Sequence, residues 1–275
     1  MWIRLQRLAP GLVILSAFVA PLTGQGGGDP NAADGEGPLF ETRDALVAGA
    51  FGFGTGVAFT VDAPVTAAFR APSVQQAPGL QEAAWTLNHL AVPGAFLISA
   101  GLYGAGRMAD DPELTHVGLH MGGSVVVATA ATYVVKALAG RQRPAADPAD
   151  PFDFRLGRGI EGRRYRAFPS GHTAIAFAAA AAAARELDRS GSGHELLVGA
   201  LTYGPAALVG AARVFDSRHW PSDVVAGAAI GVFAGWKTVD YAHRRSGNLL
   251  DRWFLGASVA PGDPGSFRVL LLPAF

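Results

Sequence analysis

Three short segments of the sequence carry most of the side chains that could do chemistry. The first contains Lys136 and Arg143, which are seven residues apart, and Pro144 directly follows them. Seven residues make nearly two turns of an α-helix, so the two cations can lie on one face before Pro144 ends the helix. Two cations that point together at a helix end could clamp an anion.

The second segment comes directly before an alanine-rich run and contains Ser170, Gly171 and His172. Ser170 is a natural N-cap residue, Gly171 permits close approach of the backbone, and His172 falls in the first helical turn. The start of a helix presents unpaired N–H groups and the positive end of the helix dipole, which favour phosphate or sulfate. A histidine at this position can serve as a general acid.

The third segment contains Arg213, His219 and Asp223. His219 and Asp223 are four residues apart, a spacing at which side chains meet on one helical face, and Pro221 suits the first turn of a helix. A carboxylate that holds one imidazole nitrogen makes the other nitrogen more basic, as a nucleophilic histidine requires. Arg213 adds a planar group of hydrogen-bond donors for phosphate.

The composition favours a membrane protein, because half of the 275 residues are hydrophobic and only 16% are charged. The 22 basic and 22 acidic residues cancel, so no net field recruits nucleic acid. The absence of cysteine excludes disulfides, thiolate catalysis and Cys-ligated zinc. Six apolar runs lack charged residues; five of them have a length that can cross a bilayer, about 17 to 25 residues, and the sixth is shorter and can extend into its flanks. These runs are residues 45–61, 83–106, 117–135, 167–184, 196–212 and 224–236.

We therefore predict an all-α fold, a polytopic membrane helical bundle with about six core helices. Gly227, Gly231 and Gly235 recur every four residues in the last run, a spacing that lets helix backbones approach closely in lipid. A soluble bundle whose helices are buried on all sides is the alternative. Residues 255–275 hold Pro-Gly-Asp-Pro-Gly between two apolar arms and could form a C-terminal β-hairpin.

Taken together, the three segments resemble the type 2 phosphatidic acid phosphatase (PAP2) family, which shares its core with vanadium haloperoxidases and class A bacterial acid phosphatases. The family pattern is K-x6-R-P, then P-S-G-H, then S-R-x5-H-x3-D, and these motifs occur here in that order within residues 42–243. One departure is Ala212, where the family has serine. The loss of one hydroxyl donor could cost about 1 kcal/mol of phosphate binding.

The resemblance implies that His219 attacks phosphorus and forms a phosphohistidine, that Asp223 orients His219, and that His172 protonates the leaving group. The residues that it implies for binding the phosphoryl oxygens are Lys136, Arg143, Ser170, Gly171 and Arg213. We expect no metal and no other cofactor, because these cations meet the charge of the phosphoryl group. The remaining histidines show no metal-ligand spacing and are interpreted as structural; they are His89, His116, His120, His194 and His243.

The sequence divides into four predicted parts. Residues 1–24 have the charged, apolar, small order of a signal peptide or N-terminal anchor, and residues 25–41 resemble a flexible linker. Residues 42–243 form the PAP2-like phosphatase domain, and residues 244–275 form a C-terminal tail. With the amino terminus inside and six spans, the three segments meet on the periplasmic or exterior side of a bacterial-type inner membrane. Cleavage of the first segment would invert this topology, and the sequence leaves cleavage open.

The expected function is that of a phosphoric monoester or diphosphate hydrolase. We expect a membrane phosphatase that acts on lipid phosphates or isoprenoid (pyro)phosphates among membrane lipids. The alternatives are a soluble, periplasmic class A-like acid phosphatase, a vanadium-dependent haloperoxidase and a non-enzymatic membrane scaffold. The motifs touch only the phosphate, so they do not rank the lipids, and the sequence leaves the oligomeric state open.

Overall fold

The computed structural model describes residues 38–191, 194–245, 248 and 251, together with the two strands. The predicted signal or anchor segment, residues 1–24, lies outside the described residues. The helices are α2 (Thr42–Arg70), α3 (Pro72–Gln75), α4 (Leu80–His89), α5 (Ala95–Ala109), α6 (Pro112–Ala139), α7 (Gly171–Arg189), α8 (Glu195–Phe215) and α9 (Pro221–Arg244). The strands β1 (Ala257–Pro261) and β2 (Phe267–Leu271) pair antiparallel, as the predicted hairpin requires.

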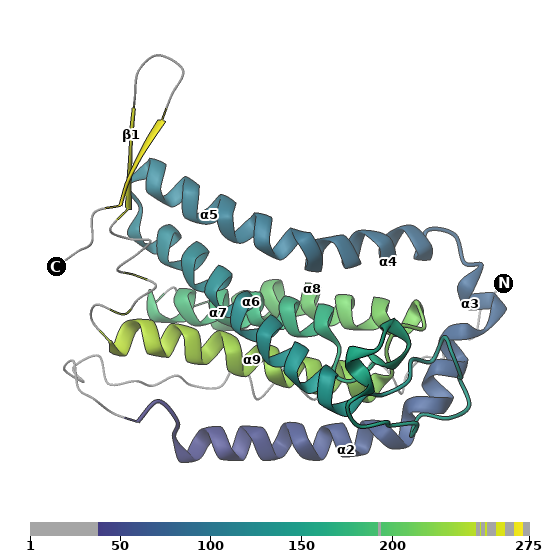
Figure 1. Ribbon diagram of the computed structural model, residues 1–275. Helices are drawn as coiled ribbons and strands as arrows, with labels where there is room; N and C mark the ends of the chain where they lie inside the picture. Colours follow the sequence, from purple (N-terminus) through teal and green to yellow (C-terminus); the bar gives the residue numbers. More distant parts are fainter. Residues whose placement is uncertain are drawn as a thin grey trace.

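Helix α7 lies at the centre of the bundle, where it packs against α6, α8 and α9. Helix α2 covers α9 on one side, and on the other side α5 packs on α6 while α4 packs on α8 (Figure 1). With α4 and α5 counted as one segment, the described residues form six long helical segments that run in alternating directions. The predicted all-α bundle of about six helices is confirmed.

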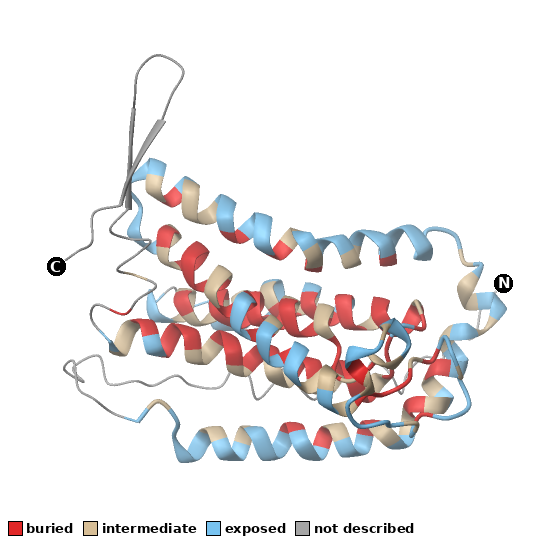
Figure 2. Cartoon of the chain, in the orientation of Figure 1, coloured by how far each residue is buried: buried red, intermediate tan, exposed pale blue. Residues whose placement is uncertain are grey.

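The outer surface of the bundle is apolar. Buried residues concentrate in the central helices, whereas α2 and α5 are mostly exposed (Figure 2). Leu46 and Phe53 of α2 are 71% and 77% exposed, and Leu201 of α8 is 67% exposed. Four helical segments of the described chain are long and apolar enough to cross a membrane. Side chains of this kind on the outside suit hydrocarbon rather than water, so the chain is a membrane protein.

The apolar run at residues 83–106 is not one continuous helix. Helix α4 ends at His89, and a π-helical turn over Leu90–Gly94 leads into α5. Pro93 lies in this turn, where it lacks the N–H that would continue the helical ladder and its ring crowds the preceding turn. The break divides the run into two helices, although Leu80–Ala109 as a whole remains one candidate membrane span.

Helix α6 ends before Arg143, which corrects the expectation that Lys136 and Arg143 share a helical face. The C-cap is Gly140, with φ of 57°, a left-handed conformation that suits glycine. A Cβ atom at Gly140 would also overlap the carbonyl oxygen of Arg155. Lys136 therefore lies in the last turn of α6, and Arg143 lies in the loop that follows.

The glycine spacing in the last run brings α9 into backbone contact with α7, as predicted. Cβ atoms at Gly227 and Gly231 would overlap the carbonyl oxygens of Ser170 and Ala174, and one at Gly235 would also overlap atoms of α7. This close packing holds the first turns of α7 against the first half of α9. Residues from two of the three sequence segments are thereby placed side by side.

A buried guanidinium ties the loop after α6 to α2 and α9. Arg141 is fully buried; its Nη2 lies 2.7 Å from Asp62 Oδ2, and its Nη1 lies 2.6 Å from Asp223 Oδ1. Ser222 completes the network, because its hydroxyl donates to Asp62 Oδ2 (2.6 Å) and its backbone N–H donates to Asp62 Oδ1 (2.8 Å). The ring of Phe59 covers the guanidinium at 4.7 Å. One side chain thus connects three parts of the fold.

We expect Arg141→Lys to lower the free energy of unfolding by about 3 kcal/mol, because lysine cannot bridge two carboxylates and leaves one buried charge unpaired. Thermal unfolding of the purified protein in detergent measures this loss. Arg155→Lys is the matched control, since the side chain of Arg155 is about half exposed and its ion pair with Asp153 should contribute much less to stability. Equal shifts in the two variants would contradict the anchoring role of Arg141.

Candidate active site

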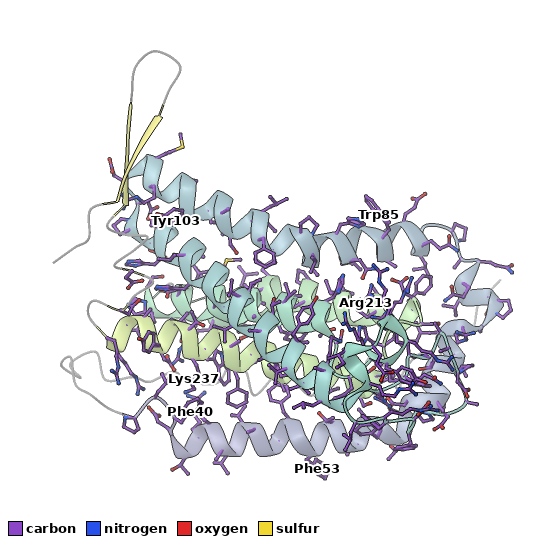
Figure 3. All side chains as sticks on the ribbon, viewed as in Figure 1. Phe40, Phe53, Trp85, Tyr103, Arg213 and Lys237 are labelled. Atoms are coloured by element: carbon purple, nitrogen blue, oxygen red, sulfur yellow. The ribbon has the colours of Figure 1, made fainter. Side chains whose placement is uncertain are left out.

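The three sequence segments meet at one end of the bundle, where α6 and α8 end and α7 and α9 begin. Arg213, in the last turn of α8, lies at this end among many other side chains (Figure 3). The polar side chains that the segments bring to this end are Lys136, Arg143, Ser170, His172, Arg213, His219 and Asp223. Their backbones are joined across segments, because the Ser170 N–H donates to the Asp223 carbonyl at 2.8 Å.

His219 is held by the backbone in one tautomer. Its side chain is buried, and Nδ1 lies 2.6 Å from the carbonyl oxygen of Ala167. Because a carbonyl oxygen only accepts hydrogen bonds, Nδ1 carries the hydrogen and Nε2 carries the lone pair. The His219 N–H also donates to the Arg213 carbonyl at 3.2 Å. The fold therefore presents Nε2 as the basic atom of this imidazole.

The surroundings of His219 keep its imidazole neutral. Burial is the main cause, and the positive charges of Lys136, Arg213 and Arg143 add to it, so the pKa of His219 lies well below its usual value of 6.5. A neutral imidazole with its lone pair on Nε2 is the form of histidine that can act as a nucleophile.

Asp223 does not hold His219 by the hydrogen bond that the four-residue spacing predicted. Asp223 Oδ2 lies 3.6 Å from His219 Nδ1, which is too long for a hydrogen bond. The same oxygen accepts the N–H of Trp220 at 2.8 Å, and the other oxygen pairs with Arg141. The reason is that α9 begins at Pro221, so His219 precedes the helix and shares no helical face with Asp223.

Arg143 and Arg213 each leave a buried hydrogen-bond donor without a partner. Four buried side-chain nitrogen or oxygen atoms of the described residues lack a partner, and two of them are the Nε atoms of these arginines. Arg213 is held in place by Asn88, whose Oδ1 accepts from Nη1 at 2.7 Å. Burial, and then the charges of Arg218 and Arg163, lower the pKa of Arg143. An oxyanion would satisfy both donors and relieve this crowding of positive charge.

Lys136 fastens the loop in front of α7. Its Nζ donates to the carbonyl oxygens of Arg166, at 2.9 Å, and Pro169. Gly171 is the first residue of α7, and a Cβ atom there would lie 3.5 Å from Cε of Lys136. The lysine side chain therefore passes directly across the start of α7.

Ser170 occupies the N-cap position of α7 as predicted, but its side chain makes no capping hydrogen bond. Its hydroxyl instead accepts from Thr173 Oγ1 at 2.8 Å. His172 lies in the first turn of α7, and Arg213 is its strongest charged neighbour. The serine side chain therefore leaves the N–H groups of this turn uncapped. The charged neighbours of His172 in this turn are Arg213, Lys136 and Arg143.

Several residues that shape the site were not predicted from the sequence. Asp62 had a signal, because a single acid within an apolar helix usually marks a paired or functional group. Asn88 and the Ala167 carbonyl had none, since only the fold brings them to Arg213 and His219. Two of the remaining histidines, which were interpreted as structural from the sequence, gather with a carboxylate at the other end of the bundle. There, histidines of α6 and α9 meet a glutamate of α7.

Comparison with known proteins gives a consistent result for the core of the chain. Residues 117–246 match the family model of the PAP2 superfamily. A lipid A 1-phosphatase of Porphyromonas gingivalis is 36% identical over 75 residues, which cover 27% of this chain and only 16% of that protein.

Among solved structures, a transmembrane PAP2-type phosphatidylglycerolphosphate phosphatase from Bacillus subtilis resembles this chain with a TM-score of 0.44 and 18% identity. The alignment covers 85% of this chain and 96% of that one. The family match in residues 117–246 contains all three site segments, from Lys136 to Asp223. This part of the chain, just under half of its length, matches the PAP2 superfamily.

Proposed function

We propose that the chain is a membrane phosphatase that hydrolyses lipid phosphates or isoprenoid (pyro)phosphates through a phosphohistidine intermediate. The observation that carries this proposal is the neutral, buried imidazole of His219, with its lone pair on Nε2, close to the unpartnered Nε atoms of Arg143 and Arg213. An enclosed nucleophile among cations that lack a counter-charge suits a phosphoryl group.

In the proposed reaction, Nε2 of His219 attacks phosphorus while the bond from phosphorus to the leaving oxygen breaks. His172 donates a proton to that oxygen. Water then attacks the phosphohistidine, the phosphorus–nitrogen bond breaks, and His172 accepts a proton from the water. The phosphorylated imidazole carries a positive charge, which the carboxylate of Asp223, 3.6 Å from Nδ1, stabilises.

The phosphoryl oxygens are proposed to bind the side chains of Arg143, Arg213 and Lys136, with the first turn of α7 contributing its N–H groups and helix dipole. Ala212, which stands where the family has serine, is buried beside Phe215 and supplies no donor. The phosphate is therefore held by charged donors and by backbone.

A lipid substrate suits the position of this site. The ends of membrane-spanning helices lie near the level of lipid headgroups, so a lipid phosphate can reach the site while its tail stays in the bilayer. A cleft of about 400 Å³ adjoins Arg213 and is lined in part by Trp85, Asn88 and Asp216. It offers space for the alcohol side of the substrate. The partial match to a lipid A 1-phosphatase supports a phosphorylated lipid as the substrate class.

We expect His219→Ala to abolish phosphate release with every substrate, because the nucleophile is lost. His172→Ala should form the phosphoenzyme slowly from a lipid phosphate, but formation should recover with an aryl phosphate whose leaving group needs no proton. The measurements are phosphate release and trapping of the phosphoenzyme from ³²P-labelled substrate.

His194→Ala is the control, because His194 is exposed at the other end of the bundle. Full activity of a folded His219→Ala protein would overturn the mechanism. If the folded wild-type protein released no phosphate from any substrate, the non-enzymatic scaffold would be favoured instead.

Turnover should be more efficient for a lipid phosphate than for a soluble ester, because each methylene of the tail contributes about 0.8 kcal/mol to partition into the membrane beside the site. We expect a higher kcat/KM for phosphatidate, phosphatidylglycerol phosphate or undecaprenyl pyrophosphate than for glycerol phosphate. Mixed micelles at fixed surface concentration provide the comparison. Equal or better turnover of glycerol phosphate would refute lipid specificity.

The site is proposed to face the periplasm or the exterior of the cell. Because the chain has no cysteine, single cysteines can report its orientation. Ala149→Cys, exposed in the loop between α6 and α7, should react with a membrane-impermeant maleimide in intact cells, and His194→Cys should react only after lysis. The reverse pattern would place the site on the cytoplasmic side.

A further inference from the structure

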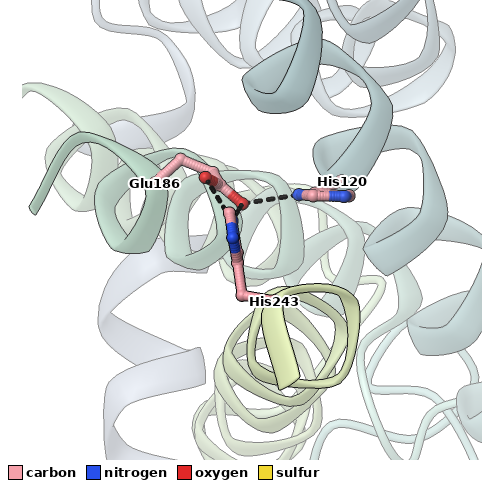
Figure 4. Close-up of side chains that lie close together, drawn as sticks. All are labelled: His120, Glu186 and His243. Carbon is pink, nitrogen blue, oxygen red and sulfur yellow. Dashed lines mark hydrogen bonds and ion pairs between the residues drawn. The ribbon is translucent and has the colours of Figure 1, made fainter. Parts of the chain in front are cut away.

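A second cluster of ionisable side chains lies at the opposite end of the bundle from the phosphate site (Figure 4). His120 on α6, Glu186 on α7 and His243 on α9 point toward one another there. Lys136 is 16 residues further along α6 than His120, which corresponds to about 24 Å. The proposed phosphatase reaction uses none of these three residues.

The three side chains direct their polar atoms at one small volume. One ligand atom from each lies within 4.8 Å of the others. His120 Nδ1 is 2.5 Å from Glu186 Oε1, and His243 Nε2 is 2.9 Å from Glu186 Oε2. His120 and Glu186 are buried, and His243 is partly buried. This is the ligand set of two imidazoles and one carboxylate that occurs in zinc sites.

The other nitrogen of His120 also has a carboxylate partner. Nε2 lies 3.2 Å from Asp251 Oδ1, and Asn248 donates to the second oxygen of Asp251 at 2.8 Å. A metal-binding histidine usually donates its second N–H to a carboxylate, which fixes the tautomer. With the hydrogen on Nε2, the lone pair of Nδ1 faces the carboxylate of Glu186. In that tautomer, the lone pairs of His120 Nδ1 and Glu186 Oε1 repel each other. A cation bound by both atoms would remove this repulsion.

A cleft lies beside the cluster. Its volume is about 310 Å³, and it is lined in part by Asp110, Asp111 and His116. The ring of His116 stacks on that of His120, with centroids 5.6 Å apart, and meets the ring of His243 at 5.8 Å. The two aspartates at this cleft would attract a cation from solvent.

We propose that His120, Glu186 and His243 bind a divalent transition-metal ion, and that Zn²⁺ is the ion that two imidazoles and one carboxylate suit best. Each ligand comes from a different core helix, so the ion joins α6, α7 and α9. It does so at the end of the bundle opposite the phosphate site, beyond the contacts that Gly227, Gly231 and Gly235 make with α7. Its role is to stabilise the bundle, and the phosphoryl chemistry does not involve it.

The test uses the full-length protein purified in detergent without chelator. We expect about one zinc ion per chain by mass spectrometry in the wild-type protein, and less than about one tenth of that in His243→Asn. Chelation should lower Tm, and added Zn²⁺ should restore it in the wild-type protein alone. At temperatures well below Tm, kcat should be the same with and without the ion.

His194→Asn is the matched control, because His194 is exposed just before α8, at the same end of the bundle, and outside the cluster. It should bind zinc like the wild-type protein. A Co²⁺ titration of chelated wild-type protein needs no variant to fold and should produce visible d–d absorption bands. Absence of these bands, together with a Tm that Zn²⁺ does not change, would overturn the proposal. The cluster would then be a network of histidines and a carboxylate that share protons.

Discussion

The pairing of one buried guanidinium with two buried carboxylates is the interaction on which the site depends. Arg141 cannot lose its charge, and it has no access to water, so Asp62 and Asp223 must both be present and correctly placed. This requirement connects an outer helix, a loop and the start of α9. Since Asp223 also accepts the Trp220 N–H, the same network sets the path of the chain through His219. The carboxylate beside the imidazole is therefore part of the framework, in addition to its part in the proposed chemistry.

Much of the architecture could be predicted from local patterns. The apolar runs indicated the helices because each pattern lies within one segment, and the stripe from Gly227 to Gly235 indicated a close helix contact without naming the partner. The three motifs also meet at one end of the bundle. Their internal spacing was less informative, because Gly140 ends α6 early and places Arg143 in a loop. A spacing along the sequence describes a helical face only while the helix continues.

The contacts that could not be predicted are those between distant segments. The partner of His219 is the carbonyl of Ala167, and every residue offers a carbonyl, so no residue type marks it. Glu186 and His243 are likewise unrelated in sequence spacing, and they meet only because α7 and α9 run parallel, side by side, from the same end of the bundle. Tertiary packing decides such contacts, and a single sequence does not encode them in a readable pattern.

The alternating direction of the helices has a consequence for the two boundaries of the bundle. Helix α2 begins and α9 ends on the same side, away from the phosphate site. If the bundle crosses the membrane in the six spans that the sequence predicts, a domain fused directly before Thr42 or directly after Arg244 would start in the compartment opposite the proposed active site. Among the described residues, the end of the bundle that holds the site is formed by internal connections of the chain. Fusions at these two boundaries can therefore recruit the protein to other partners without standing in the path of the substrate.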